Sequence, residues 1–242
     1  MKDSKEIFKR LRTGSKWLWH CGLVHLALAL IFLILLMVDK RKLMGVSIWL
    51  KPLKFAVSIA IYSISWSAVL SYFTVINLRT RFERFTVLAL SFEMVAIAFQ
   101  AARGVPSHFN NLDTYGAVLF TLMGIVITAQ TIFALYMGFR WFKECRGMLS
   151  ENLFWAIGLG IIISGIFALE GGLMGYRMSH AVGNFGDLRV AHFLGLHSLQ
   201  VLVSCCLIFG LKKPATVKLL AAAYFILISF VFYWALLGRG IF

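Results

Sequence analysis

The chain has 242 residues, of which 60% are hydrophobic and 14% are charged, and its 24 Lys and Arg against 10 Asp and Glu give a formal net charge of +14. Soluble domains are about half apolar and about a quarter charged, so this composition excludes a soluble globular protein and indicates an integral membrane protein. In such a chain the positive excess predicts loop charges that set orientation, and we expect no nucleic-acid partner.

Seven apolar runs are close to the length of about 20 residues that a helix needs to cross the hydrocarbon core. They cover residues 17–38, 53–76, 85–103, 115–139, 153–176, 190–211 and 216–237. The runs nearly fill the chain, so we expect an all-α polytopic membrane helix bundle: a basic cytoplasmic tail at residues 1–16 and a single seven-helix transmembrane domain at residues 17–242. Of the 24 Lys and Arg, 15 lie in the tail and on its side of the membrane, which predicts an N-in/C-out orientation. The first three and last three runs share no motif, which argues against a three-plus-three repeat.

The first run contains two histidines, and the connection after it is basic. His20 lies at the inner interface and is predicted to be structural, whereas His25 lies about 12 Å from the inner boundary and could form the floor of a pocket. The first outer connection carries five cations: Lys40, Arg41, Lys42, Lys51 and Lys54. The last two either reach toward outer head groups or form the cationic rim of a binding site.

The third run and the outer loop after it supply a second set of polar groups. Glu93 and Gln100 are seven residues apart and share a helical stripe, and Arg103 stands at the outer boundary. The loop RGVPSHFNNLD adds His108. In the fourth run Gln130 stands alone, and we expect it to form an interhelical hydrogen bond.

The fifth and sixth runs carry further ionisable groups in the outer half of the membrane. Glu170 lies in FALEGGLMG, whose glycines permit close approach of a backbone or ligand. The sixth run begins with DLRVAHFLGLHSLQ. At about 100° per residue its polar positions fall within an arc of about 140° on one continuous helix, with His197 roughly 10 Å and Gln200 roughly 15 Å below the outer boundary; these positions are Arg189, His192, His197 and Gln200.

The strings WLKPLKF, FQAARGVPSHFN and DLRVAHFLGLHSLQ resemble those of a group of bacterial seven-helix inner-membrane proteins without an assigned function. The resemblance implies a multi-pass protein of the bacterial inner (cytoplasmic) membrane. It carries no chemistry over to this chain.

Together these residues predict an outward-opening intramembrane pocket. The candidate ligand-binding or proton-carrying residues are Lys51, Lys54, Glu93, Gln100, Arg103, His108, Glu170, Asp187, Arg189, His192, His197 and Gln200. The preferred function is to bind and move a small anionic or amphiphilic solute with proton coupling, with Glu93, Glu170 and His197 carrying protons. The structural alternative is mutual pairing, for instance Glu93 with His197 or Asp187 with Arg103.

Two other functions remain open, and the cofactor is unknown. One is a membrane-embedded metal- or haem-dependent enzyme acting on lipid or quinone, with Glu93, Glu170, His192 and His197 as zinc ligands. The spacing of His192 and His197 turns their rings about 140° apart, which weakens the argument for a zinc site. His25 and His197 differ in depth by roughly 8 Å, which weakens the argument for a haem held by both. The other is a sensor or assembly partner. In every case we expect the lipid bilayer and a small-molecule or lipid-like ligand as partners, and we expect the four cysteines to be free thiols.

Overall fold

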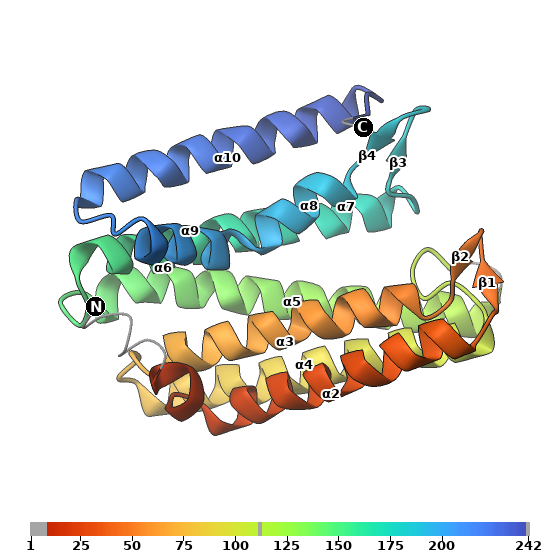
Figure 1. Cartoon of the computed structure of the whole chain (residues 1–242), viewed down its shortest axis with the longest axis horizontal. Helices are drawn as coiled ribbons and strands as arrows, with labels where there is room; N and C mark the ends of the chain where they lie inside the picture. The colour runs from red at the N-terminus through yellow and green to blue at the C-terminus, as the bar shows by residue number, and fades with distance from the viewer. Residues whose placement is uncertain (1–8, 111–112, 241–242) are drawn as a thin grey trace. The chain divides into compact units, whose positions relative to one another are not determined.

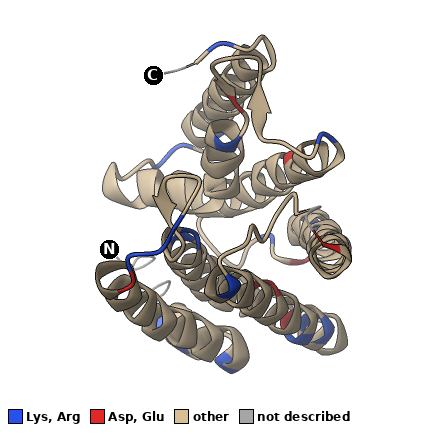
Figure 2. Cartoon of the chain, turned by 90° about the vertical axis from the view of Figure 1, so that its right-hand side faces the viewer, with Lys and Arg blue, Asp and Glu red and all other residues tan. Residues whose placement is uncertain are grey.

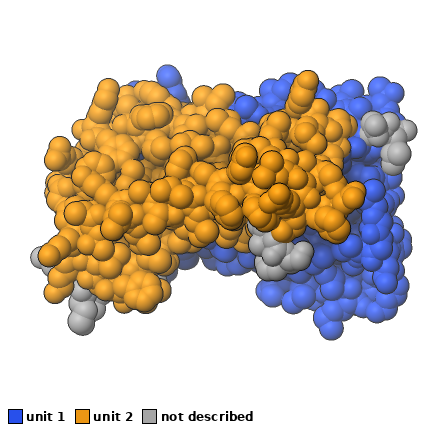
Figure 3. Space-filling view, turned by 90° about the horizontal axis from the view of Figure 1, so that it is seen from above, with its two compact units in different colours: residues 1–130 blue, residues 131–242 orange. Residues whose placement is uncertain are grey.

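The computed structural model describes residues 9–110 and 113–240, and the chain divides into two compact units, residues 1–130 and 131–242 (Figure 3). The described residues are mostly helical (Figure 1). Six helices among them are long and apolar enough to cross a membrane, and a seventh span results if one bent helix pair is counted as a single span. The prediction of an all-α chain with long apolar helices is confirmed.

Unit 1 consists of long helices and one two-stranded hairpin. Its elements are α2 (Lys16–Val38), β1 (Lys42–Leu43), β2 (Val46–Ser47), α3 (Leu50–Leu70), α4 (Ile76–Arg103) and the first part of α5 (Thr114–Glu144). Helices α2, α3 and α4 pack side by side (Figure 1). At Gly22 an added methyl carbon would lie 2.6 Å from a side-chain carbon of Ile64, so glycine lets α2 approach α3 closely. Between α3 and α4 the rings of Trp66 and Phe82 are buried with centroids 4.5 Å apart.

Unit 2 contains the rest of α5 and two helix pairs that are interrupted. Its other elements are α6 (Glu151–Ala168), α7 (Glu170–Tyr176), β3 (Ala181–Val182), β4 (Gly186–Asp187), α8 (Arg189–Leu196), α9 (Ser198–Ile208) and α10 (Pro214–Leu236). Helix α6 packs against α8, α9 and α10. A methyl carbon at Gly160 would lie 2.6 Å from the Cα atom of Leu199, so α6 and α9 are in near backbone contact. Pro214 occupies the first turn of α10, where its missing N–H leaves no helical bond unmade.

Each unit carries one short antiparallel hairpin. Between β1 and β2, Met44 and Gly45 have φ values of 52° and 81°, as in the type I′ turn that suits two-residue hairpin loops. Asp39 accepts hydrogen bonds from the side chain and backbone N–H of Arg41. Asp187 accepts the same set from Arg189 beside the second hairpin. In both cases an aspartate–arginine fork two residues apart joins a hairpin to a helix end.

The two units follow the same order of elements. In unit 1 the order is α2, hairpin, α3 and α4, and in unit 2 it is α6 with α7, hairpin, α8 with α9, and α10. This shared order exists although the first three and last three apolar runs have no motif in common. The two units therefore repeat an order of secondary-structure elements, and a comparison of sequence motifs does not detect such a repeat.

The described end of the basic tail packs against unit 1. Residues 9–13 are helical, and residues 1–8 of the predicted tail lie outside the described residues. The guanidinium of Arg10 donates to the Ser71 hydroxyl at 3.0 Å. The backbone N–H of Ser15 donates to the Ser67 hydroxyl at 3.0 Å. These bonds hold the tail against the last turn of α3.

Several span boundaries differ from those that the sequence predicts. The second span is predicted over 53–76, but α3 ends at Leu70 and the chain turns before α4 begins at Ile76. The three arginines assigned to that inner connection therefore lie in a helix, as does the chain up to Glu144 at the end of α5. Hydropathy marks the apolar part of a helix, whereas arginine and lysine are good helix formers that extend it beyond that part. The sixth span, predicted as continuous, is bent by 52° between α8 and α9, whereas the fifth remains one span with a single turn residue at Leu169.

Candidate functional site

The predicted span 153–176 is one apolar helix of 26 residues, Glu151–Tyr176, whose regular α-helical pattern is broken at a single residue, Leu169, between α6 and α7. The N–H of Gly172 reaches back only three residues, to the carbonyl of Leu169 at 2.9 Å, which is a tighter turn than an α-helix makes. Glu170 follows the interruption and is only 8% exposed. Within the described residues neither of its carboxyl oxygens has a hydrogen-bond partner. The interruption thus places an unsatisfied acid inside an apolar span.

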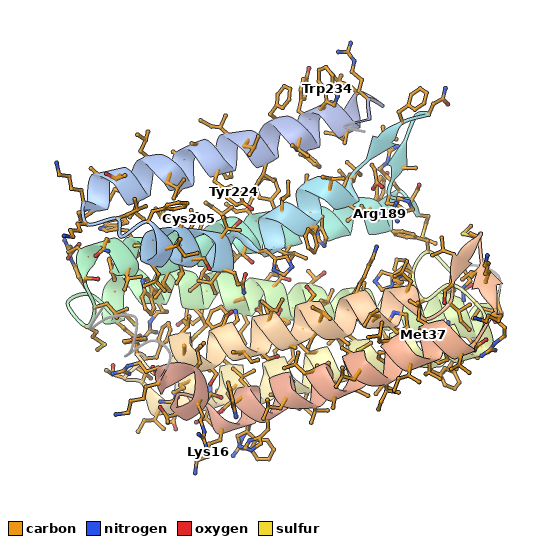
Figure 4. All side chains as sticks on the ribbon, viewed as in Figure 1. Lys16, Met37, Arg189, Cys205, Tyr224 and Trp234 are labelled. Carbon is orange, nitrogen blue, oxygen red and sulfur yellow. The ribbon has the colours of Figure 1, made fainter. Side chains whose placement is uncertain are left out.

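The second interruption is a bend of 52° between α8 and α9, at His197. The last four carbonyls of a helix lack helical partners, and at the end of α8 three of them accept hydrogen bonds from hydroxyl groups. These bonds run from Ser164 to the Leu196 carbonyl at 3.0 Å, from Ser198 to Gly195 at 2.6 Å and from Tyr224, marked in Figure 4, to Leu194 at 2.9 Å. The donors belong to α6, α9 and α10, so tertiary contacts of unit 2 stabilise the bend.

His192 connects the two interrupted spans. Its Nδ1 lies 2.9 Å from the carbonyl oxygen of Phe167, in the last turn of α6. Because a carbonyl only accepts, Nδ1 carries the proton and Nε2 is the basic nitrogen of the neutral ring. The ring faces Gly171, where an added methyl carbon would lie 3.3 Å from its Cε1. Glycine at this position leaves room for the imidazole next to the interruption.

The prediction that Arg189, His192, His197 and Gln200 share one face of a continuous helix is wrong, because the helix changes direction at His197. The bend follows His197, so Gln200 lies on α9, beyond the change of direction. Gln200 instead hydrogen-bonds the His197 side chain. Arg189, marked at the start of α8 in Figure 4, pairs with Asp187 at 2.6 Å. Burial raises the pKa of Asp187, but its hydrogen bonds with Arg189 outweigh burial, and the pKa is lowered.

In unit 1 the buried acid is Glu93, and its partner comes from the loop after α4. Glu93 is 5% exposed, and its Oε1 lies 3.5 Å from Nε2 of His108. Three aromatic rings surround the imidazole, with centroids 5.7 to 6.2 Å away: Phe55, Phe109 and Phe120. Lys51 on α3 also interacts with the charge of Glu93. The suggested pairing of Glu93 with His197 is therefore replaced by a pairing with His108.

Arg103 is held by two side chains of unit 1. It donates to the Gln100 side-chain oxygen at 2.7 Å and to Asp113 at 3.0 Å. The backbone N–H of Gly116 and the guanidinium of Arg103 both bind the carboxylate of Asp113 and lower its pKa. Each member of the suggested pair Arg103–Asp187 thus has a partner within its own unit, Asp113 for Arg103 and Arg189 for Asp187. The side-chain nitrogen of Gln100 is buried and has no hydrogen-bond partner within the described residues.

The predicted cationic rim contains paired and exposed groups. Lys51 lies on the first turn of α3 with its ammonium 5.7 Å from the centre of the Phe55 ring. The side chain of Lys54 is exposed. Arg41 is bound by Asp39, whose pKa the hydrogen bonds from Arg41 and from the Trp49 indole lower far below its usual range. Arg41, which belongs to the same basic connection but not to the predicted rim, therefore stabilises the hairpin.

Two further polar predictions concern residues buried in helix contacts. Gln130 donates to the Tyr62 hydroxyl at 2.7 Å, which confirms an interhelical hydrogen bond, here between α5 and α3. His25 is 2% exposed, and its Nδ1 lies 2.7 Å from the Cys21 carbonyl, one turn back on α2. Nε2 of His25 has no hydrogen-bond partner in the described part of the chain. His25 is thus packed within unit 1.

No group of three or more His, Cys, Asp and Glu side chains that could hold a metal occurs in residues 9–110 and 113–240. The zinc alternative with Glu93, Glu170, His192 and His197 therefore gains no support. The four cysteines are free thiols, as predicted.

Sequence reasoning missed the hydroxyl groups that bind the carbonyls of α8. Ser164 and Tyr224 lie in apolar runs, have no distinctive spacing and are far apart in the chain. The only signal was the presence of polar side chains in three runs that a helix bundle brings together. Comparison with protein-family models, curated proteins and solved structures found no match to this chain.

Proposed function

We propose that this chain is a multi-pass protein of a bacterial inner membrane and crosses it seven times, with α8 and α9 as one bent span. The N-terminus lies inside and the C-terminus outside. The support for this topology is the length and apolar character of the helices together with the excess of Lys and Arg on one side. The sequence resemblance supports the bacterial inner membrane.

Within this topology the protein binds a small anionic or amphiphilic solute and moves it together with protons. The observation that carries the proposal is Glu170, a buried acid without a partner in the described residues, next to the one-residue irregularity that divides α6 from α7 within an apolar span. An ionised side chain within a membrane costs several kcal/mol unless it is paired, so such groups mark ion and proton pathways. Interrupted spans are typical of transporters, whose binding sites use the backbone groups that the interruption frees.

His192 and His197 extend this pathway in unit 2. His192 presents its basic Nε2 near Gly171, directly after Glu170 in the chain. His197 stands at the second interruption and hydrogen-bonds Gln200. Imidazole is the side chain best suited to exchange protons near neutral pH. In this pathway Glu170 is neutral when it holds a proton, and His192 and His197 pass that proton on.

The charge balance of the chain favours an anionic solute. Lys and Arg, blue in Figure 2, outnumber Asp and Glu, red, by 24 to 10 in the whole chain. Asp39 and Asp187 are occupied by Arg41 and Arg189. Lys54 is exposed on α3 without a carboxylate at ion-pair distance in the described residues. A protein with this excess of positive charge concentrates anions near its surface by electrostatic attraction.

The test is proton movement in vesicles that contain the purified protein and a pH-sensitive dye. An inward gradient of hexanesulfonate or inorganic phosphate is imposed, and internal acidification is followed. Hexanesulfonate does not bind protons near neutral pH, so acidification reports on the protein and not on diffusion of a neutral acid. We expect acidification with the wild type and none with Glu170→Gln.

Glu151→Gln is the matched control, because Glu151 begins α6 and its side chain is exposed. It should acidify the vesicles as the wild type does. Equal acidification by Glu170→Gln and wild type would reject Glu170 as the proton carrier. Wild-type vesicles that acidify with neither anion would reject solute movement coupled to protons.

A further inference from the structure

A second charged site lies at the other end of unit 1, on the first turns of α4. Asn77, Thr80, Arg81 and Arg84 line a hollow of about 390 Å³. All four side chains carry hydrogen-bond donors, and two of them are permanently positive. At about 100° per residue these positions fall within an arc of about 100° on one face of the helix.

The two arginines of this face are not used to hold the fold. In the described part of the chain no carboxylate lies at ion-pair distance from Arg81 or Arg84. Their neighbours behave differently: Arg79 donates to the Gly14 carbonyl, and Glu83 is buried and bound to the Ser15 hydroxyl. Glu83, the acid of this segment, is therefore bound to the tail and does not neutralise the two arginines of the hollow.

The same face of α4 continues toward its C-terminus as an exposed apolar stripe. Leu88, Val95 and Phe99 are 69%, 66% and 48% exposed, and they lie within about 60° of one another on the helix. Glu93 and Gln100 lie on the opposite, buried face. Leu88 begins only about 6 Å above Arg84 along the axis. One face of α4 therefore passes from guanidinium groups to exposed apolar side chains over one helical turn.

We propose that this face of α4 binds an anionic phospholipid. Arg81 and Arg84 bind the phosphate group, Thr80 and Asn77 donate to its remaining oxygens or to the headgroup, and the acyl chains lie along Leu88 and Val95. Guanidinium groups match the geometry of phosphate oxygens. A free phosphate ion would use the cationic part of the face alone, whereas a phospholipid uses both parts, and the charge of two unpaired arginines favours a lipid with net negative charge.

The experiment is native mass spectrometry of the detergent-purified full chain titrated with phosphatidylglycerol or phosphatidylcholine. We expect the wild type to bind phosphatidylglycerol in preference to phosphatidylcholine. A basic residue at a membrane surface contributes about fivefold in affinity for anionic lipid, so Arg81→Gln with Arg84→Gln should weaken phosphatidylglycerol binding roughly 25-fold. Arg81→Lys with Arg84→Lys keeps the charge and should lose much less.

Lys212→Gln with Lys213→Gln is the control, since it removes two charges from another connection predicted to lie on the same side of the membrane. It should bind phosphatidylglycerol as the wild type does. Equal loss in the lysine and arginine variants would overturn the site in favour of general charge attraction. Equal binding of both lipids by the wild type, or displacement of the lipid by millimolar inorganic phosphate, would overturn the assignment to an anionic phospholipid. If the double glutamine variant does not fold, Arg84→Gln alone gives the same comparison with an expected loss of about fivefold.

Discussion

The bend between α8 and α9 depends on hydroxyl groups from other helices, and Tyr224→Phe removes one of them without changing the shape of the ring. The Tyr224 hydroxyl donates to the Leu194 carbonyl at 2.9 Å. A hydrogen bond of this kind contributes about 0.5–1.5 kcal/mol to stability. The carbonyl left behind belongs to a half-buried residue in an apolar span, so we expect a loss of about 1 kcal/mol.

Ser164→Ala removes the bond to the neighbouring Leu196 carbonyl and should destabilise the protein by a similar amount. In a chain of this size 1 kcal/mol lowers the melting temperature by about 2–4 °C. The double variant should lose about twice as much, with some departure from additivity because both bonds serve one bend. Thermal unfolding in detergent, followed by tryptophan fluorescence, measures these shifts.

Tyr233→Phe provides the control, because Tyr233 lies on the same helix and is 59% exposed. It should change the melting temperature by less than about 1 °C, since exposed substitutions stay within about 0.5 kcal/mol. If Tyr224→Phe and Tyr233→Phe shift the melting temperature equally, the hydroxyl does not stabilise the bend. The bend would then have to result from packing around Gly195 and Phe167.

Three other outcomes are expected. Gly195→Ala places a methyl carbon 2.1 Å from the Cβ atom of Phe167, and such overpacking destabilises a protein by about 1–3 kcal/mol or more. Size-exclusion chromatography should show a lower folded yield for this variant than for Gly124→Ala, because Gly124 has no neighbouring atom near the added methyl carbon. The pKa of Asp39 is lowered in the folded chain by Arg41, so its contribution to stability is present at neutral pH and is lost as the pH falls below about 4; Asp39→Asn should lack both the contribution and its loss, which melting curves between pH 3 and 7 would reveal. A reporter fused after Lys213 should be active on the cytoplasmic side, and an extracytoplasmic signal would contradict the orientation.

Most of the helical framework could be predicted from the sequence, because length and hydropathy mark each apolar run. The predicted run 216–237 corresponds to α10, Pro214–Leu236, and the run 17–38 to α2, Lys16–Val38. Boundaries failed where polar residues continue a helix past its apolar part, as at the start of α4. The interruptions at Leu169 and His197 involve no proline. At His197 the bend is stabilised by side chains far away in the chain, which local patterns do not encode.

The hairpins were within reach of the sequence but were overlooked. Met44–Gly45 occupies a two-residue turn that requires positive φ values at both positions, and glycine is favoured there. Each of the two Asp-x-Arg forks is a local contact between residues i and i+2. For the basic first connection the sequence predicts a rim or a headgroup contact at Lys51 and Lys54 and gives no role to Arg41, which the structure pairs with Asp39 beside the hairpin.

The candidate site shows why depth alone predicts pairing poorly. Depth suggests His197 as a partner of Glu93, but the partner that the structure shows is His108, from the loop only 15 positions later, which folds back onto α4. Short sequence separation makes such a contact cheap in chain entropy. Depth and helical phase compare only groups that lie within membrane spans. They do not consider a partner that comes from a loop folding back onto the helix.

The two buried acids differ in how their charge is balanced, and this difference assigns them different roles in the proposed pathway. Glu93 has His108 at 3.5 Å and the charge of Lys51 nearby, and both favour its ionised form, whereas its second oxygen, Oε2, has no hydrogen-bond partner in the described residues. Glu170 has no hydrogen-bond partner in the described residues, and its ionised form would bear the full cost of burial. A buried acid without a partner is therefore more stable when protonated than when ionised. Under the proposed function, Glu170 is therefore the acid that takes up and releases the proton, whereas Glu93 contacts the loop after α4 through His108.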